Sequence, residues 1–227
     1  MYKILCTTLI IASTLISCTS ASNSQNQEQT KLFDAIKSQD LNTIKALVAS
    51  GKVDLDPPTS PNKVNKALAY ASIYGNLDTV KYLLSQGVEI DGRIAYGGTA
   101  LLRASEIEKN DIAEFLIKAG ADVNAPNSFG ISAMVGYAIT CDTEMIDLAV
   151  EYGGNIDQAH IMSVSPGEGQ LAYNPIQWAI VTGNLDCVKH LVEKGAKTDI
   201  LSRDNETLLD MAIKQADKDL VSYVKKL

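Results

Sequence analysis

The sequence has few of the residues that usually carry catalysis or bind metals. Histidine occurs only at positions 160 and 190, and neither has a second histidine or a cysteine at metal-site spacing. No serine lies in a Gly-x-Ser-x-Gly motif, and Gly167 and Gly169 are not followed by the Lys-Ser/Thr pair of a phosphate loop. We therefore expect no catalytic residues, no metal and no cofactor. A residual enzyme hypothesis would place a site in the segment 158–173.

Basic residues are also in the minority. Lys and Arg together number 20 against 27 Asp and Glu, which gives a formal net charge of −7. A nucleic-acid-binding domain needs a basic face, and an anionic membrane surface attracts clusters of Lys and Arg. The charge balance therefore argues against both kinds of partner.

The apolar run from Ile4 to Ile16 is too short for a transmembrane helix, which needs about 20 apolar residues. It follows Lys3 and ends at Leu15-Ile16-Ser17-Cys18, which resembles the lipobox of bacterial lipoproteins. The resemblance implies a signal peptide over residues 1–17 and a lipid anchor on Cys18. Thr19 after the cysteine implies sorting to the outer membrane, with the domain in the periplasm. The alternative is an ordinary secretory signal with an incidental cysteine.

Residues 18–30 begin with this cysteine and continue as TSASNSQNQEQT, with no apolar residue larger than Ala after Cys18. Such a segment cannot bury enough surface to offset chain entropy, and we expect a disordered tether. The remaining cysteines of the exported chain, Cys141 and Cys187, lie in different repeats. We interpret both as small packing residues, although a periplasmic location permits disulfides.

The rest of the chain is repetitive. The apolar residues that open successive helices are spaced by 36, 33, 33, 42 and 33 positions, and the glycines that close the second helices by 36, 33, 33 and 42. The opening residues are Leu32, Leu68, Leu101, Met134, Ile176 and Leu209, and the closing glycines are Gly51, Gly87, Gly120, Gly153 and Gly195. Two independent landmarks thus give one period.

A 33-residue unit with the following motifs resembles the ankyrin repeat. Three kinds of motif carry the resemblance: the first-helix opening, as in Thr99 to Ala104; the inter-helix turn Gly-Asn-Leu-Asp, as in Gly75 to Asp78; and the closing Gly-Ala-Asp-Val-Asn at Gly120 to Asn124. The resemblance implies an all-α solenoid over residues 31–227, with six helix-turn-helix units, caps at both ends and short β-hairpin loops. Within it we place Trp178 in the core and His190 on the surface.

In ankyrin-like proteins the partner is usually held by the hairpin tips and the exposed side of the first helices, which form a concave face. The resemblance, carried over by register, selects several aromatic and aliphatic residues, and aromatic and arginine side chains are the usual interface anchors. The predicted partner-binding residues are Tyr74, Arg93, Tyr96, Glu106, Phe129, Ile131, His160, Glu168, Tyr173 and Arg203. Packing on the neighbouring hairpin is the alternative for each of them.

These features favour a membrane-anchored, non-catalytic protein-binding module of the periplasm. The most specific hypothesis is an immunity lipoprotein, which binds and neutralises a toxin or effector at the membrane. The alternative is an accessory or stress-protection lipoprotein that supports a resident periplasmic enzyme or envelope complex.

Overall fold

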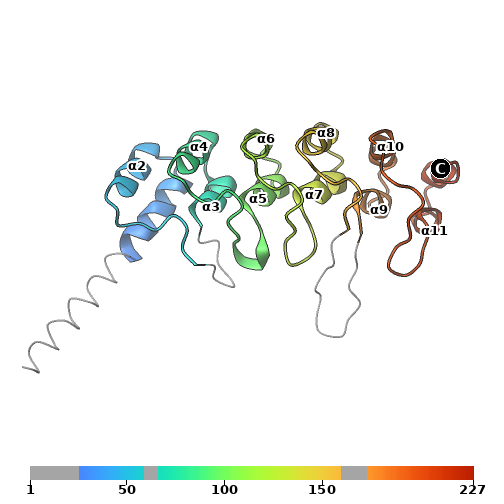
Figure 1. Cartoon of the computed structure of the whole chain (residues 1–227), viewed down its shortest axis with the longest axis horizontal. Coiled ribbons are helices and arrows are strands. Elements are labelled where there is room, and N and C mark those ends of the chain that lie inside the picture. The colour runs from blue at the N-terminus through green and yellow to red at the C-terminus, as the bar shows by residue number, and fades with distance from the viewer. Residues whose placement is uncertain (1–25, 59–65, 160–172) are drawn as a thin grey trace, which may run out of the picture.

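The computed structural model describes residues 26–58, 66–159 and 173–227. This part of the chain consists of paired helices joined by loops (Figure 1). The pairs are residues 26–37 with α2 (Leu41–Ala49), α3 (Ala67–Tyr74) with α4 (Leu77–Ser85), α5 (Ala100–Glu106) with α6 (Asn110–Lys118), α7 (Ala133–Thr140) with α8 (Thr143–Glu151), α9 (Pro175–Val181) with α10 (Leu185–Glu193), and α11 (Leu208–Lys214) with α12 (Lys218–Val224). The predicted all-α solenoid of six units is confirmed.

Local chemistry sets where the first helices begin. In units three to six the residue before the helix accepts a hydrogen bond from the backbone N–H three positions later, through Thr99, Ser132, Asn174 and Thr207. Such a cap satisfies one of the backbone donors that a helix start leaves unpaired. These four side chains therefore fix the first residue of their helices.

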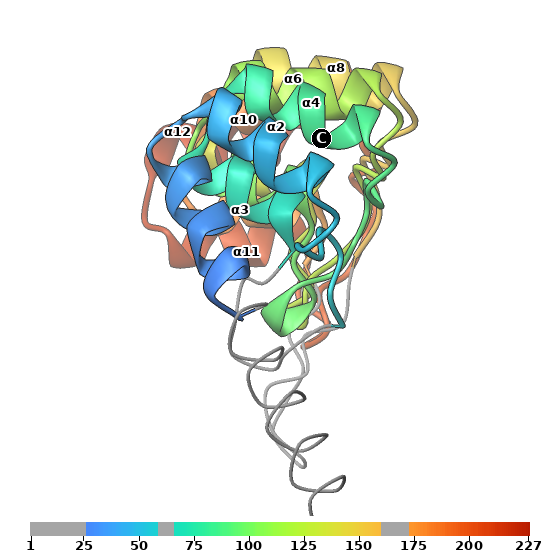
Figure 2. The ribbon, with the colours of Figure 1, turned by 90° about the vertical axis from the view of Figure 1, so that its left-hand side faces the viewer.

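The helices form two layers. The first helices stack in the order α3, α5, α7, α9 and α11, and the second helices lie on one side of them, with α4 against α6 and α6 against α8 (Figures 1 and 2). Leu101, Leu116 and Ile146 are fully buried between these layers. No single unit can cover its own apolar face, so the stacking of neighbours creates the core.

Asp and Asn side chains connect each hairpin loop to the next. Asp56, Asp91, Asn124 and Asp157 each accept a hydrogen bond from a backbone N–H of the following loop, at 2.8–3.0 Å for the shortest contact of each residue. Asn124 also donates to the carbonyl oxygen of Gly153 at 2.9 Å. We call these four residues the loop ladder. They fix the position of each loop relative to its neighbour.

The structure corrects the predicted N-terminal boundary. Residues 26–30 were predicted as the end of the tether, but they form the start of the first helix. Gln29 holds this turn in place, because its side-chain amide donates to the carbonyl oxygen of Asp54 and accepts from the Asp54 N–H, at 2.8 and 2.9 Å. The rest of the predicted tether, the signal peptide and Cys18 lie outside the described residues.

The hairpins carry little β-structure. Within the three described ranges the one β-bridge joins Leu201 to Thr207, so the predicted β-hairpins are mostly irregular loops. A short 3₁₀ turn, η1 (Ala95–Gly97), shapes the loop between units two and three. None of the helices described here is long and apolar enough to cross a membrane.

Candidate protein-binding face

In units two to five the fourth residue of the first helix lies on the side of the layer that meets the loops. Tyr70, Arg103, Gly136 and Trp178 hold this place in units two to five, and each is half-buried between buried neighbours. We call these four residues the inner row. The row is only partly covered by its neighbours and forms the floor of the candidate binding face.

The two ends of the inner row are aromatic. In unit two the ring of Tyr70 lies 4.7 Å from Phe33 and 4.6 Å from Tyr74, measured between centroids. In unit five Trp178 meets Tyr173 edge-on at 5.5 Å. The prediction that Trp178 belongs to the core is therefore wrong, because its fourth-residue position directs the indole toward the loop.

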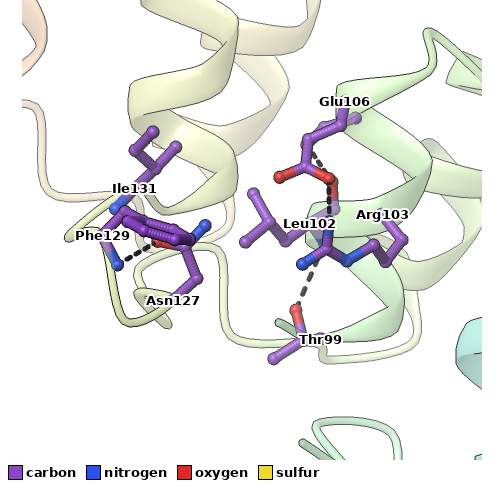
Figure 3. A network of polar contacts seen from close by, with 8 residues as sticks. Thr99, Leu102, Arg103, Glu106, Asn127, Phe129 and Ile131 are labelled. Carbon is purple, nitrogen blue, oxygen red and sulfur yellow. Dashed lines mark hydrogen bonds and ion pairs between the residues drawn. The ribbon is translucent and has the colours of Figure 1, made fainter. Parts of the chain in front are cut away.

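Arg103 and Glu106 lie between these ends and form an ion pair. Burial raises the pKa of Glu106 above its usual range, although Arg103 opposes the shift. Figure 3 shows the pair on α5, next to the loop that carries Asn127, Phe129 and Ile131. Asn127 fixes this loop, since its side-chain oxygen accepts from the backbone N–H groups of Phe129 and Ile131 at 2.9 and 3.0 Å.

Gly136 leaves the middle of the inner row without a side chain. A methyl group at this position would meet only the Ser105 hydroxyl, at an ordinary contact distance of 3.6 Å. Glycine inside a helix is less stable than alanine by about 0.5–1 kcal/mol, and the neighbouring packing does not require it here. The glycine therefore makes room on the surface between Arg103 and Trp178.

Two exposed aromatic residues form the tips of neighbouring loops. Tyr96 and Phe129 are 55% and 44% exposed, and their ring centroids lie 5.8 Å apart. The Ser128 N–H donates to the carbonyl oxygen of Tyr96 at 2.7 Å, which holds the two loops together. Exposed aromatic side chains on a fixed backbone are suited to contact a protein partner.

Arg93 joins the same two loops. Its guanidinium donates to the carbonyl oxygens of Gly97 and Pro126, at 2.8 and 2.6 Å. The residue is exposed, but these bonds commit one guanidinium nitrogen to holding the tips. The predicted partner contact at Arg93 therefore coincides with a structural role.

The other predicted contacts are more widely spread. Tyr74 is 44% exposed at the end of α3, and Lys37 lies over its ring at 5.9 Å. Tyr173 is half-buried, and Arg203 is exposed in the loop before α11. His160 and Glu168 lie outside the described residues.

Sequence reasoning identified the loop tips but missed Arg103 and Gly136. The available signal was the register: both hold the fourth position after a helix cap. His190 also differs from the prediction, because it is half-buried and lies 2.7 Å from Asp147 across the second-helix layer.

The described ranges contain no group of three or more His, Cys, Asp or Glu side chains placed to hold a metal ion. The inner row and the tips instead combine aromatic, aliphatic and paired charged groups on a fixed backbone. Such a surface is suited to contact another protein.

The sequence profile of ankyrin repeats (3 copies) matches residues 5–94, 32–127 and 101–200. The chain belongs to the ankyrin-repeat family. This ankyrin-repeat protein is 23% identical to a putative ankyrin repeat protein of Rickettsia felis over 193 residues, which cover 85% of this chain and 45% of that protein. It is 37% identical to protein phosphatase 1 regulatory subunit 27 of Mus musculus over 98 residues, or 43% of this chain and 62% of that one.

The tyrosine-protein kinase HTK16 of Hydra vulgaris is 28% identical over 151 residues, but the match spans 65% of this chain and 19% of the kinase. The ankyrin-repeat protein thus corresponds to a fifth to a half of the length of the first two curated relatives.

Among solved structures, one is described as the predatory endopeptidase Bd0816 from Bdellovibrio bacteriovorus in complex with immunity protein Bd3460. A chain of it is similar with a TM-score of 0.69 and 28% identity, covering 86% of this chain and 96% of that chain. Ankyrin repeats bind other proteins, and this family membership identifies the chain as a protein-binding module.

Proposed function

We propose that this ankyrin-repeat protein is a membrane-anchored immunity protein that binds and neutralises an exported enzyme. The observation that carries the proposal is the similarity to a chain of the endopeptidase–immunity protein complex, which covers nearly all of that chain at 28% identity. The proposed role needs a binding surface and no catalytic group. The loop tips and inner row supply such a surface.

The binding surface we propose has a defined centre. Tyr96 and Phe129 form its raised edge, the Arg103–Glu106 pair its floor, and Gly136 an opening that a partner side chain can enter. The formal charge of −7 favours a partner with a basic contact surface, because complementary charge speeds the encounter of two proteins. The partner class is therefore an enzyme with a basic, protruding contact region.

Anchoring is part of the same proposal. A lipid on Cys18 would hold the domain at the periplasmic side of the outer membrane, where an exported enzyme passes. Replacement of this residue, Cys18→Ser, is expected to move the protein from the membrane fraction to the soluble fraction of the envelope. Continued membrane attachment of the variant would contradict the anchor without affecting the binding surface.

Affinity capture with two matched variants tests the binding function. Gly136→Trp fills the centre of the inner row, and Ser85→Trp adds the same side chain at an exposed position of α4 in the second-helix layer. Each variant is used to capture proteins from envelope extracts of the organism that encodes the chain. The captured enzyme is then purified and assayed with an equimolar amount of the wild-type chain.

We expect one enzyme to bind the wild type and Ser85→Trp, to be lost with Gly136→Trp, and to be inhibited at equimolar ratio. An enzyme that binds in the same pattern but keeps or gains activity would support the accessory role and contradict immunity. A partner that binds Gly136→Trp as well as the wild type would show that the inner row is not the binding surface.

A further inference from the structure

Cys141 and Cys187 are neighbours in space although they belong to different repeats. Cys187 is fully buried in the first turn of α10, and its thiol donates to the carbonyl oxygen of Ala138 at 3.3 Å. Ala138 lies one turn before Cys141, which ends α7. Cys141 is close enough to the Cys187 thiol to contribute to a raised pKa of that thiol. The Cys187 thiol therefore lies against the end of α7, where Cys141 follows, at the boundary between units four and five.

Cys141 follows α7 in a left-handed turn that other units form with other residues. The residue has φ of +59°, in the left-handed region. Gln39, Glu108, Gly183 and Ala216 hold the equivalent places in other units, with φ between +57° and +72°, so this turn does not require cysteine. Both described cysteines are free thiols in this structure.

We propose that Cys141 and Cys187 form an intrachain disulfide that joins units four and five once the chain meets a disulfide-containing oxidant. This bond would connect the end of α7, which also carries Gly136, to the start of α10. Its formation in the cell rests on the export stated under the proposed function, because disulfides persist in oxidising compartments. The chemistry of the pair does not depend on that location.

The two thiols differ in access, and this sets the order of the exchange. Burial raises the pKa of Cys187 well above its usual range, and the neighbouring Cys141 adds to the shift. Cys141 is half-buried, so it is the thiol that an external disulfide can reach. Its thiolate attacks the oxidant R–S–S–R, forms a mixed disulfide and releases one R–SH.

Cys187 then completes the reaction. It loses its proton and attacks the Cys141 sulfur, which forms the Sγ–Sγ bond and releases the second R–SH. In total, two protein thiols are oxidised and one external disulfide is reduced to two thiols.

The test uses the full-length chain with Cys6→Ser and Cys18→Ser, so that only the proposed pair remains. The chain is incubated with mixtures of oxidised and reduced glutathione, and peptide mass mapping without reductant follows the link between the two cysteine peptides. Control chains carry an additional Cys141→Ser or Cys187→Ser. Thermal melting is measured for the oxidised and reduced forms.

We expect the linked peptide to appear as the main product, with the melting temperature raised by about 10 °C over the reduced chain. The Cys187→Ser control should stop at a glutathione adduct on Cys141, and the Cys141→Ser control should remain unmodified. A glutathione adduct that persists on Cys141 while Cys187 is present, or cross-linked dimers in place of the intrachain link, would overturn the proposal. If the link forms in vitro but the thiols are reduced in protein isolated from cells, the proposed export is contradicted. The ability of the two cysteines to form the disulfide is then still supported.

Discussion

The stability of a Gly136 variant tests whether the inner row is open at its centre. Gly136 lies in the middle of α7, and the side chain of Gly136→Ala would meet only the Ser105 hydroxyl at 3.6 Å. Glycine in a helix interior is less stable than alanine by about 0.5–1 kcal/mol. We therefore expect Gly136→Ala to increase the free energy of unfolding by that amount. The corresponding rise in melting temperature is about 1–4 °C for a chain of this size.

A second glycine provides a control with the opposite sign. Gly75 ends α3, and a methyl group added there would lie 2.8 Å from the carbonyl oxygen of Ala71, which is closer than such contacts allow. Gly75→Ala should therefore destabilise the fold, while Gly136→Ala stabilises it. Both effects are measured by urea denaturation followed by far-ultraviolet circular dichroism.

A large side chain at position 136 extends the argument to binding. Trp178 holds the equivalent position in unit five, so we expect Gly136→Trp to fold with stability within about 1 kcal/mol of the wild type, the usual scale for substitutions without a buried clash. Loss of partner binding would then result from the Trp side chain, which occupies the space that the partner needs. Destabilisation of more than about 2 kcal/mol by either Gly136→Ala or Gly136→Trp would refute the reasoning, because it would mean that the neighbouring packing already fills this space.

Three further predictions concern stability. Leu101→Ala should lower the free energy of unfolding by about 2–5 kcal/mol, because the side chain is fully buried at the centre of the stack; a loss under 1 kcal/mol in urea denaturation would contradict this. Asn124→Ala should cost about 1–2 kcal/mol by removing two bonds of the loop ladder, and hydrogen exchange should increase in the following loop, whereas unchanged exchange would argue against the ladder. Partial desolvation raises the pKa of Asp147, but hydrogen bonds from Lys194 and His190 outweigh it and lower the pKa overall. The stability advantage of the wild type over Asp147→Asn should therefore be present above the ordinary carboxyl pKa and disappear as the pH falls through the lowered value; an advantage that persists in acid would contradict the assignment.

The repeat and its helix boundaries could be predicted because they follow from local rules. The closing glycines and the caps at Thr99 and Thr207 depend on residues a few positions apart, and the structure places helices where those signals occur. Residues 26–30 were misassigned because their order depends on a distant bond from Gln29 to the backbone of Asp54. Polar composition alone does not show such a partner.

The candidate site was only partly predictable for a similar reason. Tyr96 and Phe129 were identified from their register, and the structure brings their rings together. Trp178 was misplaced because its register in the repeat was interpreted as inward, whereas the structure leaves it half-buried against Tyr173. The proximity of Cys187 to the end of α7 was not predicted, since it depends on how units four and five stack.

The loop ladder has a consequence for how the length of this protein can change. Each hydrogen bond of the ladder joins a side chain of one loop to a backbone N–H of the next, so the same kind of bond recurs between successive loops. The joint from Asp157 reaches Lys197 even though the intervening segment is longer than in the regular units. Duplication or loss of a whole unit would therefore leave every remaining joint with a suitable partner. The binding surface can therefore be lengthened or shortened during evolution by one repeat at a time, to match partners of different size.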